Sequence, residues 1–324
     1  MEYILNETPY KTTNGFLMNS IKVKLDLPNS YDFHEYQESI QKQKKKNLDT
    51  KIGFSFPEYY DMTITENQAL TYEFQNQDCL VENIKIHPKK ESNIILFYES
   101  KDKNEHFHFL NLDMNITKNT NITIVNLLSE NSYHFISIEG TVQKNATLTT
   151  NIIDIGSKVQ INRVEMETLE EGNNQLNHIY MGKNNDVIDI NYHLKNEEKK
   201  SINRIEVQGV LNDHAKKHFK GTIDFISGCS ESIGEENENC VLLSDTCISR
   251  SLPMLMCGEE NVVGAHSVSS GKIEEDKLFY LQSRGLSKKE SEKIIIQSNF
   301  GKVLENITNE TLKESLYQKI ESLI

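Results

Sequence analysis

From about Thr65 to Gly271 the chain repeats one pattern, a short burst in which apolar and polar residues alternate. Asn, Asp, Gly, Lys or Ser separates the bursts, which include Phe107/Phe109, Leu110/Leu112/Met114/Ile116, Ile122/Ile124, Leu148 to Ile155 and Val187 to Ile190. Because alternate side chains of a strand share a face, each burst can bury one face and expose the other. No proline occurs within residues 89–252, which suits continuous strand ladders. The pattern predicts a mostly β core over residues 65–273.

Similar turn-then-strand phrases recur within this region. They are Lys118-Asn-Thr-Asn-Ile, Lys144-Asn-Ala-Thr-Leu and Lys183-Asn-Asn-Asp-Val, and the second interval is clearly longer than the first. Two architectures fit short strands of this kind, a β-sandwich and a β-solenoid. Irregular repeats of weak hydrophobicity favour the solenoid. In that architecture, successive copies of the turn-then-strand motif would lie one or two solenoid turns apart.

The segments on either side of the β core have different residue patterns. Residues 1–64 are mixed, with helical spacing at residues 31–40 and a lysine cluster at residues 42–46, which we interpret as a solvated helix end rather than a phosphate or partner patch. Residues 274–324 are helical: Arg284-Gly285 closes a first helix, and Ser287 with Glu290 forms a capping box. The apolar face of the second helix is expected to include Ile294, Ile295 and Phe300, and a final helix is expected from about Glu310. We therefore expect an N-terminal mixed segment, a β core and a C-terminal helical segment.

Bulk composition excludes several classes of function. The formal net charge of -13 argues against a nucleic-acid binder, which needs a basic stripe. The longest apolar runs are too short to span a membrane, the N-terminus lacks a signal-peptide pattern, and five cysteines do not form a disulfide scaffold. A reduced, cytoplasmic compartment is the simplest expectation. Seven acidic residues against one arginine between Glu231 and Glu260 indicate a solvated acidic face, or else an anionic surround for a metal or a basic partner.

Cys247, Cys257 and His266 fall close together in the sequence and carry groups that bind iron–sulfur clusters, zinc or copper. From these residues alone, a packed cysteine and a hydrogen-bonding structural histidine are the default explanation, and a metal or sulfur site is the alternative. No Cys-x2-Cys pair, nucleophile elbow or phosphate-binding loop is present, because the spacing from Gly264 to Lys272 is wrong for the last. The sequence therefore predicts neither an enzyme nor a nucleotide site of its own.

Residues 209–307 resemble the C-terminal part of the SufB/SufD family of iron–sulfur cluster assembly proteins. The resemblance rests on Gly209-Val-Leu, Phe219-Lys-Gly221, Val241-Leu-Leu-Ser-Asp245, Pro253-x-Leu255, Gly264-Ala-His266, Gly271-Lys-Ile273, Leu278-Phe-Tyr-Leu-Gln-Ser-Arg-Gly-Leu286 and Phe300. It implies a right-handed parallel β-helix core with helical segments at both ends. It also implies a scaffold in which SufB and SufD pair through their β-helices, share a transient iron–sulfur cluster, and each carry a SufC ATPase.

The resemblance also suggests which residues act. His266 falls on the SufD histidine implicated in cluster assembly, and Cys247 falls where SufB places its sulfur-accepting cysteine. The carboxylates that flank the SufB histidine are absent, since this chain has Ala265-His266-Ser267, and the Leu-Glu-Ile phrase of SufD is Leu255-Met-Cys257. Cys247 and His266 are therefore the expected transient metal ligands, with a partner chain supplying the rest.

The expected ATPase-docking helix carries aromatic anchors and one arginine. Its candidate contact residues are Leu278, Phe279, Tyr280, Leu281, Arg284 and Gly285. Packing of the same helix against the last turn of the solenoid is the alternative.

Three functions remain open. The first is a SufD-like subunit that acts with SufB and a SufC-type ATPase. The second is a minimal SufB-type homodimer in which Cys247 accepts sulfur, and the third, of another class, is a β-solenoid carbohydrate-active protein.

Overall fold

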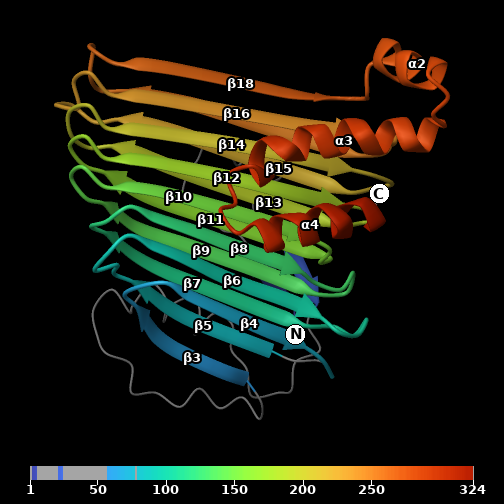
Figure 1. The fold of residues 1–324 in the computed structure, drawn as a ribbon, viewed down its shortest axis with the longest axis horizontal. Coiled ribbons are helices and arrows are strands. Elements are labelled where there is room, and N and C mark those ends of the chain that lie inside the picture. The colour runs from blue at the N-terminus through green and yellow to red at the C-terminus, as the bar shows by residue number, and fades with distance from the viewer. Residues whose placement is uncertain (1, 6–20, 25–56, 77–78, 324) are drawn as a thin grey trace. The chain divides into compact units, whose positions relative to one another are not determined.

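The computed structural model describes residues 2–5, 21–24, 57–76 and 79–323, which form two compact units, Met1–Glu58 and Tyr59–Ile324 (Figure 1). In the first unit, β1 (Glu2–Leu5) pairs antiparallel with β2 (Ile21–Lys24). The helix and lysine cluster predicted within residues 31–46 lie outside the described residues.

The second unit contains two eight-stranded sheets between which the chain alternates. The even sheet is made of β4 (Gln68–Phe74), β6 (Ser92–Ser100), β8 (Thr120–Leu127), β10 (Thr147–Ile155), β12 (Asn173–Gly182), β14 (Ile202–Leu211), β16 (Ile233–Leu242) and β18 (Val263–Gly271). The odd sheet is made of β3 (Pro57–Ile64), β5 (Cys79–Ile86), β7 (Phe107–Ile116), β9 (Tyr133–Val142), β11 (Val159–Thr168), β13 (Val187–Asn196), β15 (Lys216–Phe225) and β17 (Ile248–Cys257).

Neighbouring strands in each sheet are parallel, so every full turn of the chain adds one strand to each sheet. The predicted parallel β-solenoid is confirmed. Tyr133 pairs with Val159, whereas Lys216 pairs with Ile248, so the later of these two turns contains more residues than the earlier one. The recurring phrases are unevenly spaced for a second reason: the first two precede β8 and β10 of the even sheet, whereas the third precedes β13 of the odd sheet.

Several connections between strands contain a residue with a left-handed backbone conformation. Asn145, Asn184 and Asp213 have φ of 61°, 51° and 53°, the left-handed region that asparagine and aspartate tolerate better than most residues. Asn145 and Asn184 are the second residues of two of the recurring phrases. A short turn residue of this kind lets the chain leave one sheet and enter the other.

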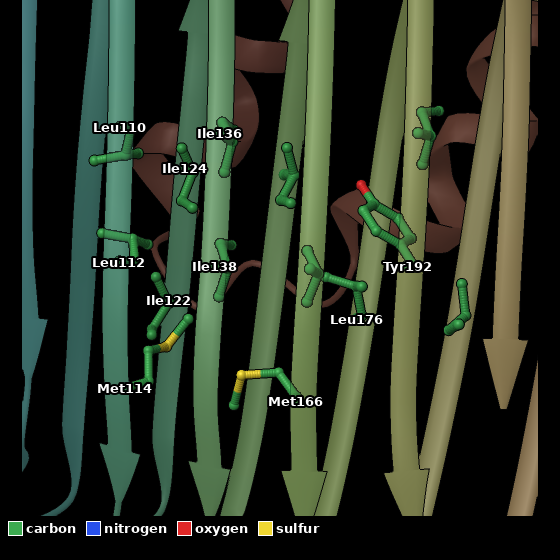
Figure 2. Packing of buried hydrophobic residues seen from close by; sticks show 14 of the residues in the cluster. Leu110, Leu112, Met114, Ile122, Ile124, Ile136, Ile138, Met166, Leu176 and Tyr192 are labelled. Carbon is green, nitrogen blue, oxygen red and sulfur yellow. The ribbon is translucent and has the colours of Figure 1, made fainter. Parts of the chain in front are cut away.

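Apolar side chains fill the space between the two sheets. Figure 2 shows residues from successive turns stacked along the interior, among them Leu112, Ile124 and Ile138, all 2 % exposed or less. Each inward-facing side chain packs against the side chain at the equivalent position of the next turn, so one hydrophobic core runs along the solenoid.

The interior also holds a polar cluster that the alternating pattern did not predict. The Asp154 carboxylate accepts hydrogen bonds from Asn126 Nδ2 (2.6 Å) and Asn162 Nδ2 (2.7 Å), and His178 Nε2 lies 3.3 Å from it. Burial opposes ionisation of Asp154, but the nearby His178 and His134 rings and the hydrogen bond from Asn126 outweigh it and lower its pKa to about 2. Burial lowers the pKa of His134 to about 3. Asp154 is therefore an ionised group held by internal donors.

The C-terminal helices are α2 (Glu275–Ser283), α3 (Lys288–Leu304) and α4 (Glu310–Leu323). Figure 1 shows α3 and α4 across the outer face of the even sheet, with α2 beyond the end of β18. The helix stop at Arg284-Gly285 is confirmed, with Gly285 at φ 96°, and so is the Ser287–Glu290 capping box. No described helix is long and apolar enough to cross a membrane.

The buried side of α3 differs from the prediction. Ile296, Phe300 and Val303 are fully buried against outward side chains of the even sheet such as Val125 and Ile179. Ile294 is 42 % exposed, so placing it on the apolar face was wrong. Because Ile294, Ile295 and Ile296 are consecutive, the sequence does not show which of them points towards the core. The contact of α3 with the even sheet buries Ile296.

Candidate functional site

Strands β17 and β18 end the two sheets, and together they form what we call the open end of the solenoid. Among the described strands, each has a neighbour along one edge: β17 pairs with β15, and β18 pairs with β16. Neither strand contains a fully buried residue, in contrast to the strands of the preceding turns. Ile248, Met256 and Val263 are among the exposed large apolar side chains here.

The two terminal strands run in opposite senses. A short connection, residues 258–262, joins the end of β17 to the start of β18, and Ser249 Oγ near the start of β17 lies 2.8 Å from Ser270 Oγ near the end of β18. A Cβ added at Gly264 would touch Phe225 and Leu255 of the odd sheet. Gly264, His266, Val268 and Ser270 of β18 therefore face the interior, since alternate residues share a face.

His266 lies in the middle of β18 and is exposed, because no further turn of the described solenoid covers it. Cys247 lies in the turn just before β17 and is partly buried against the core. Its Sγ lies 3.1 Å from Ser244 Oγ and 3.6 Å from the Asp213 carbonyl oxygen.

The structure places Cys247 and His266 at the same end of the solenoid but does not bring them together. His266 precedes Ser270 along β18, whereas Cys247 precedes Ser249, so the two residues lie on opposite sides of the Ser249–Ser270 contact. Because β17 and β18 run in opposite directions, the four residues from His266 to Ser270 and the two residues from Cys247 to Ser249 are counted in the same direction along the sheets. At ~3.3 Å per residue, Cys247 and His266 are therefore about 20 Å apart along the strand direction. Within the described part of the chain, no group of three or more His, Cys, Asp or Glu residues could hold a metal ion.

A buried polar network lies directly beneath the open end. Lys217 of β15 and Glu238 of β16 form an ion pair with both side chains fully buried. Ser251 Oγ of β17 accepts from Lys217 Nζ at 2.8 Å and donates to Glu238 Oε2 at 2.6 Å, and Tyr180 OH donates to Glu238 Oε1 at 3.3 Å. The network joins the last turn to the turns below it.

Glu236, on the same inward face of β16 as Glu238, is bonded quite differently. It is fully buried, yet neither carboxylate oxygen has a hydrogen-bond partner among the residues that the structure describes. Burial raises the pKa of Glu236 to about 8, and the Glu238 carboxylate adds to the rise. The expectation of a solvated acidic face within residues 231–260 is therefore wrong for Glu236 and Glu238, which point into the solenoid.

Helix α2 is the other exposed feature near this end. It has no buried residue; Phe279 is 73 % exposed and Tyr280 is 57 % exposed, while Leu278 and Leu281 are partly buried. The Arg284 guanidinium lies 5.4 Å from the centre of the Tyr280 ring. The predicted contact residues thus lie on α2 or, for Arg284 and Gly285, directly after it, and the two aromatic side chains are exposed to solvent.

The fold and its open end define a class of protein, the parallel β-solenoids that leave a terminal turn uncovered beside a solvent-exposed helix. Residues 71–299 match the family model described as "SUF system FeS cluster assembly, SufBD core domain". The match covers more than two thirds of the sequence and extends well before the motifs at residues 209–307. The chain belongs to the SufB/SufD family.

Several curated relatives are similar over part of their length. The iron–sulfur cluster assembly protein SufD of Escherichia coli is 22 % identical over 233 residues, 71 % of this chain and 55 % of that protein. SufD of Bacillus subtilis is 30 % identical over 123 residues, 38 % of this chain and 28 % of that protein. A SufBD family protein of Pyrococcus horikoshii is 27 % identical over 176 residues, 53 % and 39 % of the two chains. The chain spans about half the length of the Escherichia coli protein.

Proposed function

We propose that this chain is a SufD-like scaffold subunit of an iron–sulfur cluster assembly complex. It pairs through the open end with a SufB-type subunit, and α2 docks a SufC-type ATPase. The cluster is transient cargo shared with the partner, and nucleotide hydrolysis belongs to the ATPase. Membership of the family and the similarity to two SufD proteins support this assignment. A cytoplasmic location is part of the same proposal.

The observation that carries the proposal is the uncovered last turn. Strands β17 and β18 are 10 and 9 residues long, and no other strand in the described part of the chain pairs with the second edge of either one. A long free edge is a template for pairing with another chain, and proteins usually cover or interrupt such edges. The exposed apolar side chains Ile248, Met256 and Val263 add to the same surface. A second subunit that adds strands here satisfies the free backbone groups and buries those side chains.

Docking of an ATPase is supported by the exposure of α2. Aromatic side chains are over-represented among the residues that contribute most to the binding energy of protein interfaces. Phe279 and Tyr280 expose most of their aromatic surface to solvent, where a partner could bury it. Arg284 near the Tyr280 ring supplies a positive charge at the same place.

The ATPase contact is tested by replacing both aromatic residues. Phe279→Ala with Tyr280→Ala is expected to lower the amount of ATPase that co-purifies with the tagged chain by about tenfold or more, because each anchor contributes more than ~1 kcal/mol at such interfaces. The melting temperature is expected to stay unchanged, since α2 has no buried residue. Ile294→Ala, an exposed apolar residue of α3, is the matched control and is expected to retain the ATPase. Full recovery of the ATPase with the double variant would contradict the proposed docking helix.

A further inference from the structure

Glu236 and His266 occupy neighbouring positions at the open end. In the register of β16 and β18, Glu236 pairs directly with His266. Both residues belong to the inward face of the even sheet, so their side chains leave the backbone in the same direction, one turn apart. Glu236 is fully buried in the turn below, and His266 is exposed in the last turn.

The two inward carboxylates of β16 are bonded very differently. Glu238 has Lys217, Ser251 and Tyr180 as partners. Glu236, equally buried, has no hydrogen-bond partner on either oxygen within the described ranges 2–5, 21–24, 57–76 and 79–323. Removing a carboxylate from water without a donor or a cation is costly, so native proteins rarely retain such a group without a use for it.

The opposite sheet leaves space for this carboxylate. Gly221 of β15 faces it, and a Cβ at position 221 would collide with both Glu236 oxygens. Pro253 of β17 pairs with Gly221 in the register, so only the last turn lies between the carboxylate and the open end. Glu236 is therefore an unpartnered oxygen donor one layer below an exposed imidazole.

We propose that Glu236 and His266 together bind one divalent transition-metal ion at the open end. A carboxylate oxygen and an imidazole nitrogen suit ferrous iron, and both bond the metal at about 2.0–2.2 Å in comparable sites. Strands of a sheet lie ~4.8 Å apart, which leaves room for an ion between side chains on adjacent strands. Water or the partner subunit completes the coordination. The inference deepens the proposed function, since it gives His266 a ligand partner within its own chain where the sequence pointed to Cys247.

The purified chain offers a direct test with Co²⁺ alone as an optical probe for a ferrous site. The wild type is expected to show the visible absorption of protein-bound Co²⁺, and both Glu236→Gln and His266→Ala are expected to raise the Co²⁺ dissociation constant at least tenfold. Glu236→Gln keeps the side-chain volume, and His266→Ala changes an exposed residue, so a folding defect in one leaves the other as the test. Glu235→Gln is the matched control: it is the adjacent carboxylate, outward-facing and paired with Arg204, and it is expected to bind Co²⁺ like the wild type.

Three results would overturn the inference. The first is wild-type affinity in Glu236→Gln, the second is wild-type affinity in His266→Ala, and the third is an intense thiolate-to-cobalt charge-transfer band, which would place the ion on a cysteine. Co-purification of the ATPase is measured on the same variants and is expected to be unchanged. A wild-type chain that binds Co²⁺ but no ATPase or paralogous subunit would contradict the proposed function and leave the metal site standing.

Discussion

Replacing His266 by alanine is expected to lower the rate of cluster assembly by the complex about 100-fold. Loss of the metal ligand that we propose at His266 should equal or exceed the 10–100-fold cost that is typical for residues that merely support ligands. The melting temperature of the chain is expected to remain unchanged, because His266 is exposed at the last turn. The measurements are the activity of iron–sulfur enzymes in cells that depend on the variant, and cluster absorption in the purified complex. His214→Ala, an exposed histidine in the turn before β15, is the matched control.

Cys247→Ser separates the two scaffold hypotheses. In the SufD-like role the partner supplies the sulfur-accepting thiol, so Cys247→Ser is expected to retain activity while His266→Ala loses it. In a minimal SufB-type homodimer both variants lose activity. The ~20 Å between the two residues along the strands means that one chain cannot bring both to a single ion, so a homodimer would have to join Cys247 of one copy to His266 of the other. Near-normal cluster assembly by His266→Ala would contradict both roles.

Lys217→Met is expected to destabilise the chain by about 3–5 kcal/mol, because it leaves the Glu238 carboxylate buried without its cation. The Lys217–Glu238 pair is fully buried, and Ser251 and Tyr180 alone cannot neutralise the charge. The measurement is the shift of the urea unfolding midpoint, converted with the wild-type slope.

Two further variants make this prediction specific. Lys217→Met combined with Glu238→Leu removes both charges and is expected to recover most of the lost stability. Lys90→Met breaks the Lys90–Glu66 pair, whose side chains are 63 % and 62 % exposed, and is expected to cost less than about 1 kcal/mol. A loss in Lys217→Met as small as the one expected for Lys90→Met would show that the buried pair does not hold the last turns together.

The β-solenoid fold could be predicted from the sequence because each turn carries the same short pattern of residues. Period-two alternation identified the strands, the absence of proline indicated continuous ladders, and the Lys-Asn phrases marked turns that the left-handed Asn145 and Asn184 later explained. The assignment of each strand to a sheet was not accessible, since turns of unequal length mask the repeat. The phase of α3 at Ile294 depended on a tertiary contact and was predicted wrongly.

The candidate site was only partly accessible. Cys247 and His266 lie close together in sequence, but the chain reverses between β17 and β18 and carries them apart. Glu236 and Glu238 were counted with the exposed acids because composition does not distinguish the two faces of a strand. The register of β16 and β18 pairs Glu236 with His266, and alternation then places both side chains on the inward face.

Backbone hydrogen exchange at β17 and β18 tests the central claim, that a second subunit completes the open end. In the chain alone, amides on the free edges of these strands are expected to exchange quickly. In a complex with a SufB-type subunit, the account predicts that exchange within both strands slows at least tenfold. Exchange that stays fast there, while another face of the solenoid becomes protected, would contradict it.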